Sequence, residues 1–429
     1  MSRPEEAAGR WERDADTAVG TESSKAYRGG THRSCRPEET LARVLPLADQ
    51  MGITRLANVT GLDTIGIPVY MACRPLSRSI AVSQGKGLTT AEAKTSAFME
   101  AAESYHAERI TAPVKLVSFN ELRRDHAVID IDGLPRSALG EFHPDRQILW
   151  IEGSRLGDTA TAKRLWVPLE LVSTNFTLPQ PSGSFAFPAN TNGLASGNSQ
   201  AEAQLHALCE LVERDALTLW RLGGDAARTA SKLDAGTVDS PAARALLARY
   251  HDAGLAVGLW DTTSDLGVPV FCCAVAERSD TAVEAELGAG CHPDREVALL
   301  RALTEAAQSR TTRIAGSRDD YVPESYDEAA KLARNRTAQL WVAEPPRRSY
   351  ADVPHLAGNT IAGDLAGVVA LLADKGIGDL VAVDLSKPEI GIPVARVVAA
   401  GLEGAYQGRG SDYRPGPRAR ARGLSLPPP

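Results

Sequence analysis

The chain contains the pattern Gly-(Ile or Val)-Pro-Val three times, and each copy opens an apolar run. The copies begin at Gly66, Gly267 and Gly391 and lead into YMAC, FCCAVA and ARVVAA. Proline lacks the N–H that a strand interior donates, so it is tolerated at the first residue of a strand. The β-branched residues that follow favour the strand itself. The pattern therefore predicts three strand entrances.

Helical periodicity occupies much of the sequence between these strands. The predicted helices are 90–109, 199–222, 294–313 and a shorter one at 365–375. Further strands are expected at 256–261 and 380–384. Strands and helices mixed in this way predict an α+β class, with mixed sheets and packed helices.

Composition limits what such a fold can bind. The chain has 429 residues, 43% of them hydrophobic, which is enough for a substantial core. A formal net charge of −7 and only 5% aromatic residues argue against nucleic acid as a partner. No apolar run is long enough to span a bilayer, and no signal-peptide pattern opens the chain, so we expect a cytoplasmic protein without membrane contact. The six cysteines and eight histidines are scattered, which predicts neither a zinc site nor a disulfide framework.

The two ends of the chain differ from the rest. Residues 1–24 are polar, charged and aperiodic, which predicts a disordered N-terminal tail. Residues 408–429 are rich in Arg, Gly and Pro, end in three prolines and predict a C-terminal tail. The folded domain is therefore expected at 25–407.

The strongest candidate for chemistry is a loop rich in Gly and Asn that leads into the helix 199–222. On a helical wheel, one third of the circumference carries an amide, three carboxylates and, at its edge, an arginine. These residues are Asn198, Glu202, Glu210, Glu213 and Arg214.

Two interpretations of this acidic stripe remain open. An acidic stripe commonly faces water on an ordinary amphipathic helix. This stripe holds no lysine, however, and crowded carboxylates repel one another unless a cation lies among them. A hard divalent cation takes oxygen ligands of this kind.

The helix 90–109 repeats the arrangement. Ser96, Glu100 and Glu103 share one face, and the preceding segment SQGKG places Lys86 between two glycines. A lysine just before a helix suits a phosphate. The P-loop pattern is absent, and Gly-Lys-Gly alone is most often only a turn.

Basic groups come from two further segments. Arg301, in the helix 294–313, could hold a phosphate through its planar guanidinium or form an ordinary surface ion pair with Glu305. Near the N-terminus, Arg33 and Thr40 could also reach a phosphate. Acidic helices and basic loops of this kind suit an oxygen-ligated Mg²⁺ that holds a polyphosphate.

These stretches together resemble the YcaO family. The matching segments are SQGKGLTTAEAKTSAFMEAAE, NTNGLASGNSQAEAQLHALCELVERDA, GAGCHPDREVALLRALTEAAQSR, IPVARVVAAGLEG and PGPRAR. The similarity runs from about residue 25 to the end, so that 25–407 is expected to be a YcaO domain.

The resemblance implies a site for ATP and Mg²⁺. Carried over by position, the metal ligands are Glu100, Glu103, Glu202 and Glu213. The residues expected to contact ATP are Arg33, Thr40, Lys86, Asn198, Glu210, Arg214 and Arg301.

The resemblance also implies that a ribosomally made precursor peptide is the substrate, with a backbone amide activated by O-phosphorylation. A neighbouring Cys, Ser or Thr as nucleophile gives an azoline, an external sulfide gives a thioamide, and an amine gives an amidine. The segments KAYRGGTHRSCRPEETLARV and GITRLANVTGLDTIGIPV look like those of members that work with a TfuA partner, several of which make thioamides. The terminal prolines lack the alternating P-x-P-x-P of azoline-forming members. A thioamide is therefore favoured over an azoline.

The short polar N-terminus cannot be a leader-binding domain, so we expect a partner protein in trans, TfuA-like or leader-binding. A homodimer is a family-level expectation. Two other classes of function remain open. One is a catalytically inactive scaffold that keeps the fold, against which the retained carboxylates argue. The other is an ATP-dependent ligase of small molecules.

Overall fold

The computed structural model describes residues 24–157, 163–278, 285–321, 323–408 and 411–426. Most of the predicted N-terminal tail and the three terminal prolines lie outside these residues. Within them, no helix is both long enough and apolar enough to cross a membrane.

Three strand-and-helix units form the centre of the molecule. In each, a strand that starts at the Val of Gly-x-Pro-Val pairs antiparallel with a second strand, and the second strand leads into a long helix. The first unit is β2 (Val69–Cys73), β3 (Val82–Lys86) and α3 (Thr90–Glu108). The second is β10 (Val270–Glu277), β11 (Glu286–Cys291) and α8 (Arg295–Ala315). The third is β13 (Val394–Ala399), β7 (Leu194–Ser196) and α5 (Gln200–Leu222). The three predicted strand entrances and the three long helices are therefore confirmed.

The long helices start at side-chain caps. Thr89, Ser199 and Asp294 are the N-caps of α3, α5 and α8, and each accepts a hydrogen bond from a backbone N–H of the first turn. Such a cap stabilises a helix by about 1 kcal/mol, because it satisfies one of the donors that the first turn leaves free.

Glycines let two of these helices lie directly on their strands. A Cβ added to Gly85 of β3 would lie 2.0 Å from Ala97 N in α3, and one added to Gly288 of β11 would lie 2.2 Å from Ala302 O in α8. Only a residue without a side chain allows so close an approach of helix and strand backbones.

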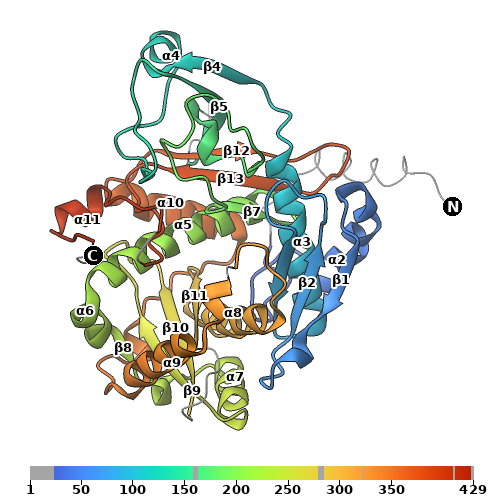
Figure 1. Ribbon diagram of the computed structural model, residues 1–429, viewed down its shortest axis with the longest axis vertical. Helices are drawn as coiled ribbons and strands as arrows, with labels where there is room; N and C mark the ends of the chain where they lie inside the picture. The colour runs from blue at the N-terminus through green and yellow to red at the C-terminus, as the bar shows by residue number, and fades with distance from the viewer. Residues whose placement is uncertain (1–23, 158–162, 279–284, 322, 409–410, 427–429) are drawn as a thin grey trace.

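The strands form three antiparallel sheets, in the orders β1-β2-β3, β11-β10-β9-β8 and β4-β5-β12-β13-β7, with β6 beside β5. The remaining strands are β1 (Arg55–Asn58), β4 (Val114–Ser118), β5 (Gln147–Arg155), β6 (Arg164–Pro168), β8 (Lys232–Leu233), β9 (Leu255–Asp261) and β12 (Leu380–Asp384). Figure 1 shows α5 crossing the middle of the molecule, with β12 and β13 above it and β9, β10 and β11 below it. Mixed helices and sheets of this kind confirm the α+β class.

Shorter helices cover the outside. They are α2 (Pro37–Val44), α4 (Phe119–Asp125), α6 (Gly224–Ser231), α7 (Pro241–Asp252), α9 (Glu328–Ala343), α10 (Ile361–Asp374) and α11 (Pro417–Ala421). Buried apolar side chains fill the space between the layers, with Phe98 and Trp150 in one cluster and Tyr250 and Phe271 in another. Each such side chain contributes about 1.5–3 kcal/mol when fully buried.

Part of the segment predicted as a C-terminal tail packs against the domain. Tyr413 and Ala419 are buried, and Ala419 N donates to Glu403 Oε1 at 2.8 Å. Arg418 in α11 forms an ion pair with the buried Asp215 of α5 at 2.9 Å. Residues 411–426 are thus joined to the helix that carries the acidic stripe.

Candidate functional site

A cavity of about 510 Å³ lies between α3, α5 and α8. It falls within the usual size range of small-molecule sites. All the residues predicted to contact ATP or Mg²⁺ line it. They are Arg33, Thr40, Lys86, Glu100, Glu103, Asn198, Glu202, Glu210, Glu213, Arg214 and Arg301.

The three helices present their polar residues at equivalent positions. Glu100, Glu210 and Glu305 each lie eleven residues after the N-cap of their helix. Three residues further on, α3 and α5 carry Glu103 and Glu213, whereas α8 carries Gln308. All six side chains line the cavity, so each helix turns the same face toward it. The acidic stripe of α5 is therefore not a face exposed to water.

Several of these carboxylates are held in an environment that disfavours their charge. Burial raises the pKa of Glu100 to about 7, that of Glu103 to about 8 and that of Glu213 to about 7. Neighbouring carboxylates add to the effect. Lys86 partly offsets it at Glu100, hydrogen bonds from Ser196 at Glu103, and Arg214 and Lys86 at Glu213. A divalent cation among these oxygens would favour the ionised forms.

The sequence alone does not assign Glu305 to the site. One expectation is a surface ion pair between Glu305 and Arg301. In the structure, Lys86 Nζ lies 2.9 Å from Glu305 Oε2 instead. Burial alone would raise the pKa of Glu305, but the charges of Lys86 and Arg214 outweigh it and lower that pKa. Arg301 donates to the carbonyl of Cys291 at 3.3 Å, and its guanidinium remains in the cavity wall.

The N-terminal segment closes the cavity at the start of α5. Thr40 Oγ1 donates to Asn198 Oδ1 at 2.8 Å, and Arg33 Nη1 lies 3.6 Å from Glu202 Oε2. The side chain of Arg43, which was not predicted as a site residue, also donates to Asn198 Oδ1. These contacts hold Arg33 and Thr40 beside Glu202, although they are far away in the sequence.

Further along α5, Arg214 lies between two carboxylates. Its guanidinium is 3.2 Å from Glu210 Oε1 and 3.2 Å from Glu213 Oε1. Gly193 N donates to the other oxygen of Glu210 at 3.1 Å, which ties the Gly- and Asn-rich loop to the helix. The Arg214 Nε atom is buried and has no hydrogen-bond partner among the residues that the structure describes.

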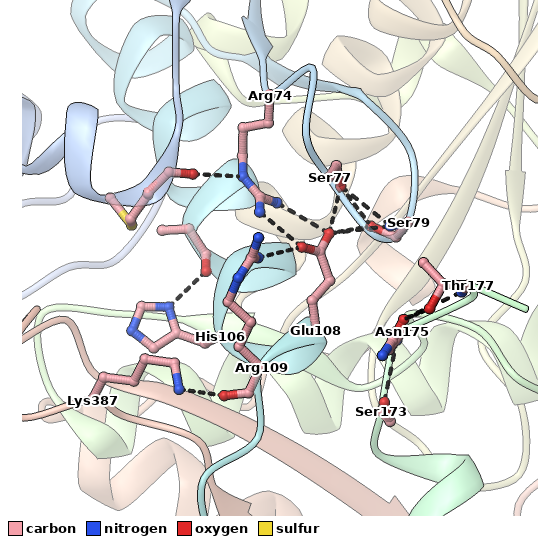
Figure 2. Close-up of polar contacts among 12 residues, drawn as sticks. Arg74, Ser77, Ser79, His106, Glu108, Arg109, Ser173, Asn175, Thr177 and Lys387 are labelled. Carbon is pink, nitrogen blue, oxygen red and sulfur yellow. Dashed lines mark hydrogen bonds and ion pairs between the residues drawn. The ribbon is translucent and has the colours of Figure 1, made fainter. Parts of the chain in front are cut away.

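A buried ion pair fixes the far end of α3 (Figure 2). Glu108 accepts hydrogen bonds from Arg74 at 3.2 and 2.8 Å and also from Ser77 and Ser79. Burial alone would raise the pKa of Glu108, but the hydrogen bonds from Arg74 and Ser77 outweigh it and lower the pKa to about 2. Because Glu108 lies at the end of α3, this network helps to hold Glu100 and Glu103 in position.

Sequence reasoning missed two other features. His206 lies on α5 between Glu202 and Glu210 and lines the cavity, and its buried Nδ1 has no hydrogen-bond partner within the described part of the chain. Its place on the acidic stripe was the available signal. The histidines are also less scattered than expected, because His32, His292 and Asp364 bring potential ligand atoms within 4.8 Å of one another.

This histidine cluster holds the N-terminal segment in place. Lys25 Nζ lies 2.6 Å from Asp364 Oδ2, and both side chains are fully buried. His292 Nδ1 accepts a hydrogen bond from Asp294 N at 3.0 Å, so that nitrogen is already used within the protein. The cluster anchors the residues that lead to Arg33.

Comparison with known proteins agrees with this geometry. Residues 84–403 match the family model described as YcaO cyclodehydratase, ATP- and Mg²⁺-binding. A protein described as an uncharacterized protein in the tfuA 3′ region of Rhizobium leguminosarum bv. trifolii is 36% identical over 379 residues, which are 86% of this chain and 88% of that protein.

Two solved structures have a similar fold. The structure of YcaO from Methanopyrus kandleri bound with AMPPCP and Mg²⁺ has a TM-score of 0.69 at 24% identity, covering 89% of this chain and 95% of that one. A heterocyclase in complex with substrate and cofactor has a TM-score of 0.73 at 23% identity. The match covers 90% of this chain and 54% of the heterocyclase, so this chain spans about half of that protein.

The long family match, together with the fold, defines a protein of a class that binds ATP and Mg²⁺. The chain belongs to the YcaO family. ATP and Mg²⁺, which the sequence led us to expect, are the cofactors that the family description names.

Proposed function

We propose that this chain uses ATP and Mg²⁺ to activate backbone amides of a ribosomally made precursor peptide, with a thioamide as the favoured product and an azoline as the alternative. The observation that carries this proposal is the convergence of acidic side chains from α3, α5 and α8 on one cavity. The relative in the tfuA 3′ region supports a thioamide and a partner protein that acts in trans.

The residues present fit a metal–polyphosphate ligand. Glu100, Glu103, Glu202 and Glu213 would hold Mg²⁺, because burial raises the pKa values of Glu100, Glu103 and Glu213 by more than the neighbouring groups lower them, and a divalent cation would favour the ionised forms. Glu305 is added to this set by its equivalent position on α8.

The other lining groups fit the nucleotide. Arg33, Lys86, Arg214 and Arg301 would neutralise the phosphates, and Thr40, Asn198 and Glu210 would position them or the ribose and base. When bound, MgATP supplies the γ-phosphoryl group that turns the amide oxygen into a leaving group.

The direct test is calorimetric titration of AMPPCP, with and without Mg²⁺, into the wild type, Glu202→Gln and the control Glu389→Gln. Glu389 is an exposed glutamate outside the cavity, so its substitution removes the same charge elsewhere. We expect Mg²⁺-dependent binding in the wild type and the control and a loss of at least tenfold in Glu202→Gln. Equal affinity of all three proteins for AMPPCP in the presence of Mg²⁺ would show that Glu202 is not part of the binding site.

Product chemistry is tested separately. Co-expression with a precursor peptide and a TfuA-like partner, followed by intact mass measurement, separates the two products. A thioamide replaces oxygen by sulfur and gains mass, whereas an azoline loses one water. Loss of water without incorporation of sulfur would identify the product as an azoline and exclude a thioamide.

A further inference from the structure

His206 is a polar residue of the cavity wall to which the proposed function gives no role. It lies seven residues after the N-cap of α5, just as Ser96 and Arg301 lie seven residues after the N-caps of α3 and α8. All three side chains line the cavity. Each long helix therefore presents a polar group at this equivalent position, and on α5 that group is an imidazole.

The imidazole of His206 has hydrogen-bonding capacity that the described part of the chain does not use. Its Nδ1 is buried and has no hydrogen-bond partner among the described residues. The residue is nevertheless partly exposed and lines the cavity, so Nε2, at the far end of the ring, is the nitrogen that a ligand can reach. A ligand atom at Nε2 would give the ring a hydrogen bond that the protein alone does not supply.

The surroundings keep this imidazole neutral. Burial holds the pKa of His206 well below the usual 6.5, and the charges of Arg301, Arg33 and Lys86 lower it further. A neutral imidazole carries one donor nitrogen and one acceptor nitrogen. At neutral pH His206 can therefore make a hydrogen bond at Nε2 without adding a charge to the site.

The same three cations indicate what lies opposite His206. In the proposed function, on which this inference rests, they neutralise the phosphates of ATP. Two of them already have carboxylate partners, because Arg33 Nη1 lies 3.6 Å from Glu202 Oε2 and Lys86 Nζ lies 2.9 Å from Glu305 Oε2. What this part of the cavity gains from a neutral imidazole is therefore a directed N–H group, and not another charge.

We propose that Nε2 of His206 donates a hydrogen bond to a phosphate oxygen of bound ATP and so positions the polyphosphate. The proton then lies on Nε2 in the complex, and Nδ1 keeps a buried lone pair. A hydrogen bond to an ionised acceptor is stronger than one between neutral groups. Mg²⁺ fits Nε2 less well as a partner, because it takes oxygen ligands.

The first measurement is calorimetric titration of AMPPCP, in the presence of Mg²⁺, into the full chain. His206→Leu removes the donor, whereas His206→Gln keeps an N–H donor in its side-chain amide. The control is His251→Leu, at an exposed histidine of α7. We expect AMPPCP to bind at least tenfold more weakly to His206→Leu, and to stay within about threefold of the wild type in His206→Gln and in the control.

The second measurement is made on the wild type, labelled with ¹⁵N in its histidine side chains. The spectrum of His206→Gln identifies the His206 signals by their absence, and the ¹⁵N chemical shifts show which ring nitrogen carries the proton. We expect the Nε2–H form in the complex with Mg²⁺ and AMPPCP, and an Nε2 signal that moves when AMPPCP is added. A residue that only packs against its neighbours would show neither.

The outcomes separate this inference from the proposed function. Equal AMPPCP affinity of His206→Leu and the wild type would overturn the role of His206, and so would an Nε2 without a proton in the complex, as in a metal ligand. Weak binding by both variants, with His206 signals that AMPPCP does not change, would reduce the residue to a packing role. A wild type that fails to bind Mg²⁺ and AMPPCP would instead count against the proposed function.

Discussion

Lys86 Nζ lies 2.9 Å from Glu305 Oε2, and this ion pair joins the end of β3 to the middle of α8. The pair links two elements that are far apart in the sequence, at the wall of the same cavity. Lys86 also partly offsets the burial of Glu100 and Glu213. Lys86 therefore contributes, together with Arg214, positive charge to a site that is rich in carboxylates.

Replacing Lys86 should destabilise the metal-free protein. In Lys86→Gln, Glu305 loses its partner, and we expect the free energy of unfolding to fall by about 1–3 kcal/mol, the usual cost of losing a charged hydrogen bond. Urea unfolding with and without Mg²⁺ measures this free energy. The difference between the wild type and Lys86→Gln should be smaller when Mg²⁺ is present. Lys375→Gln, at an exposed lysine, is the control. A loss of equal size in both variants would contradict a specific role for the pair.

Metal binding should release protons at neutral pH. The pKa of Glu103 is about 8, so at pH 7 this carboxyl is mostly protonated, and a bound cation requires the ionised form. We expect the affinity for Mg²⁺–AMPPCP to rise between pH 6 and pH 9. Calorimetry in buffers of different ionisation enthalpy measures the protons, and Glu103→Gln should release fewer of them. An identical number in both proteins would refute the prediction.

The same raised pKa has a consequence for stability. An unfolded glutamate has a pKa of about 4.3, so between about pH 4.3 and pH 8 the folded protein binds more protons than the unfolded chain. The contribution of Glu103 to stability is therefore lost as the pH rises through this range in the absence of metal. Thermal unfolding of the wild type and Glu103→Gln at several pH values checks the direction of this pH dependence of stability.

Glu108 should behave in the opposite way. Its pKa is about 2, so the stability it contributes is present above the unfolded pKa of about 4.3 and lost as the pH falls toward 2. Glu108→Gln leaves Arg74 without its buried partner, and we expect a loss of about 3–5 kcal/mol at pH 7. Urea unfolding at pH 7 and pH 3 measures it. A difference between wild type and variant that does not shrink at pH 3 would exclude the ion pair as the cause.

The buried pair of Lys25 and Asp364 should be needed to hold the N-terminal segment. Lys25→Met leaves a fully buried carboxylate without a cation, which costs about 3–5 kcal/mol. Because the same segment carries Arg33, AMPPCP should also bind more weakly. The double variant Lys25→Met, Asp364→Leu removes the unpaired charge and should recover most of the stability, whereas simply additive losses would show that the two residues are not coupled.

The helices and their acidic faces could be predicted because both depend on local spacing. The Gly-x-Pro-Val pattern and the stripe that ends at Glu213 are readable within one short window. The ion-pair partner of Glu305 could not be predicted in this way. Arg301 lies one turn away on the same helix, but the ion pair forms with Lys86 on another element. Similarly, nothing in the sequence places His32 beside His292.

Composition was a weaker guide than periodicity at the C-terminus. The segment rich in Arg, Gly and Pro predicted a tail, yet Tyr413 and Ala419 in that segment are buried. Two buried apolar residues are enough to anchor this segment when Arg418 also forms an ion pair with the buried Asp215. Such contacts depend on tertiary structure and leave no periodic signal.

The three strand-and-helix units also bear on the order in which the molecule can become active. Each unit presents polar side chains at the same helical positions, and the three helices line one cavity together. The strand that supports α5 is β13, which lies far downstream of α5 in the sequence. A nascent chain that does not yet include β13 therefore lacks the support of its central helix. Nucleotide would then bind only after β13 has paired with β7, so that it selectively stabilises folded molecules.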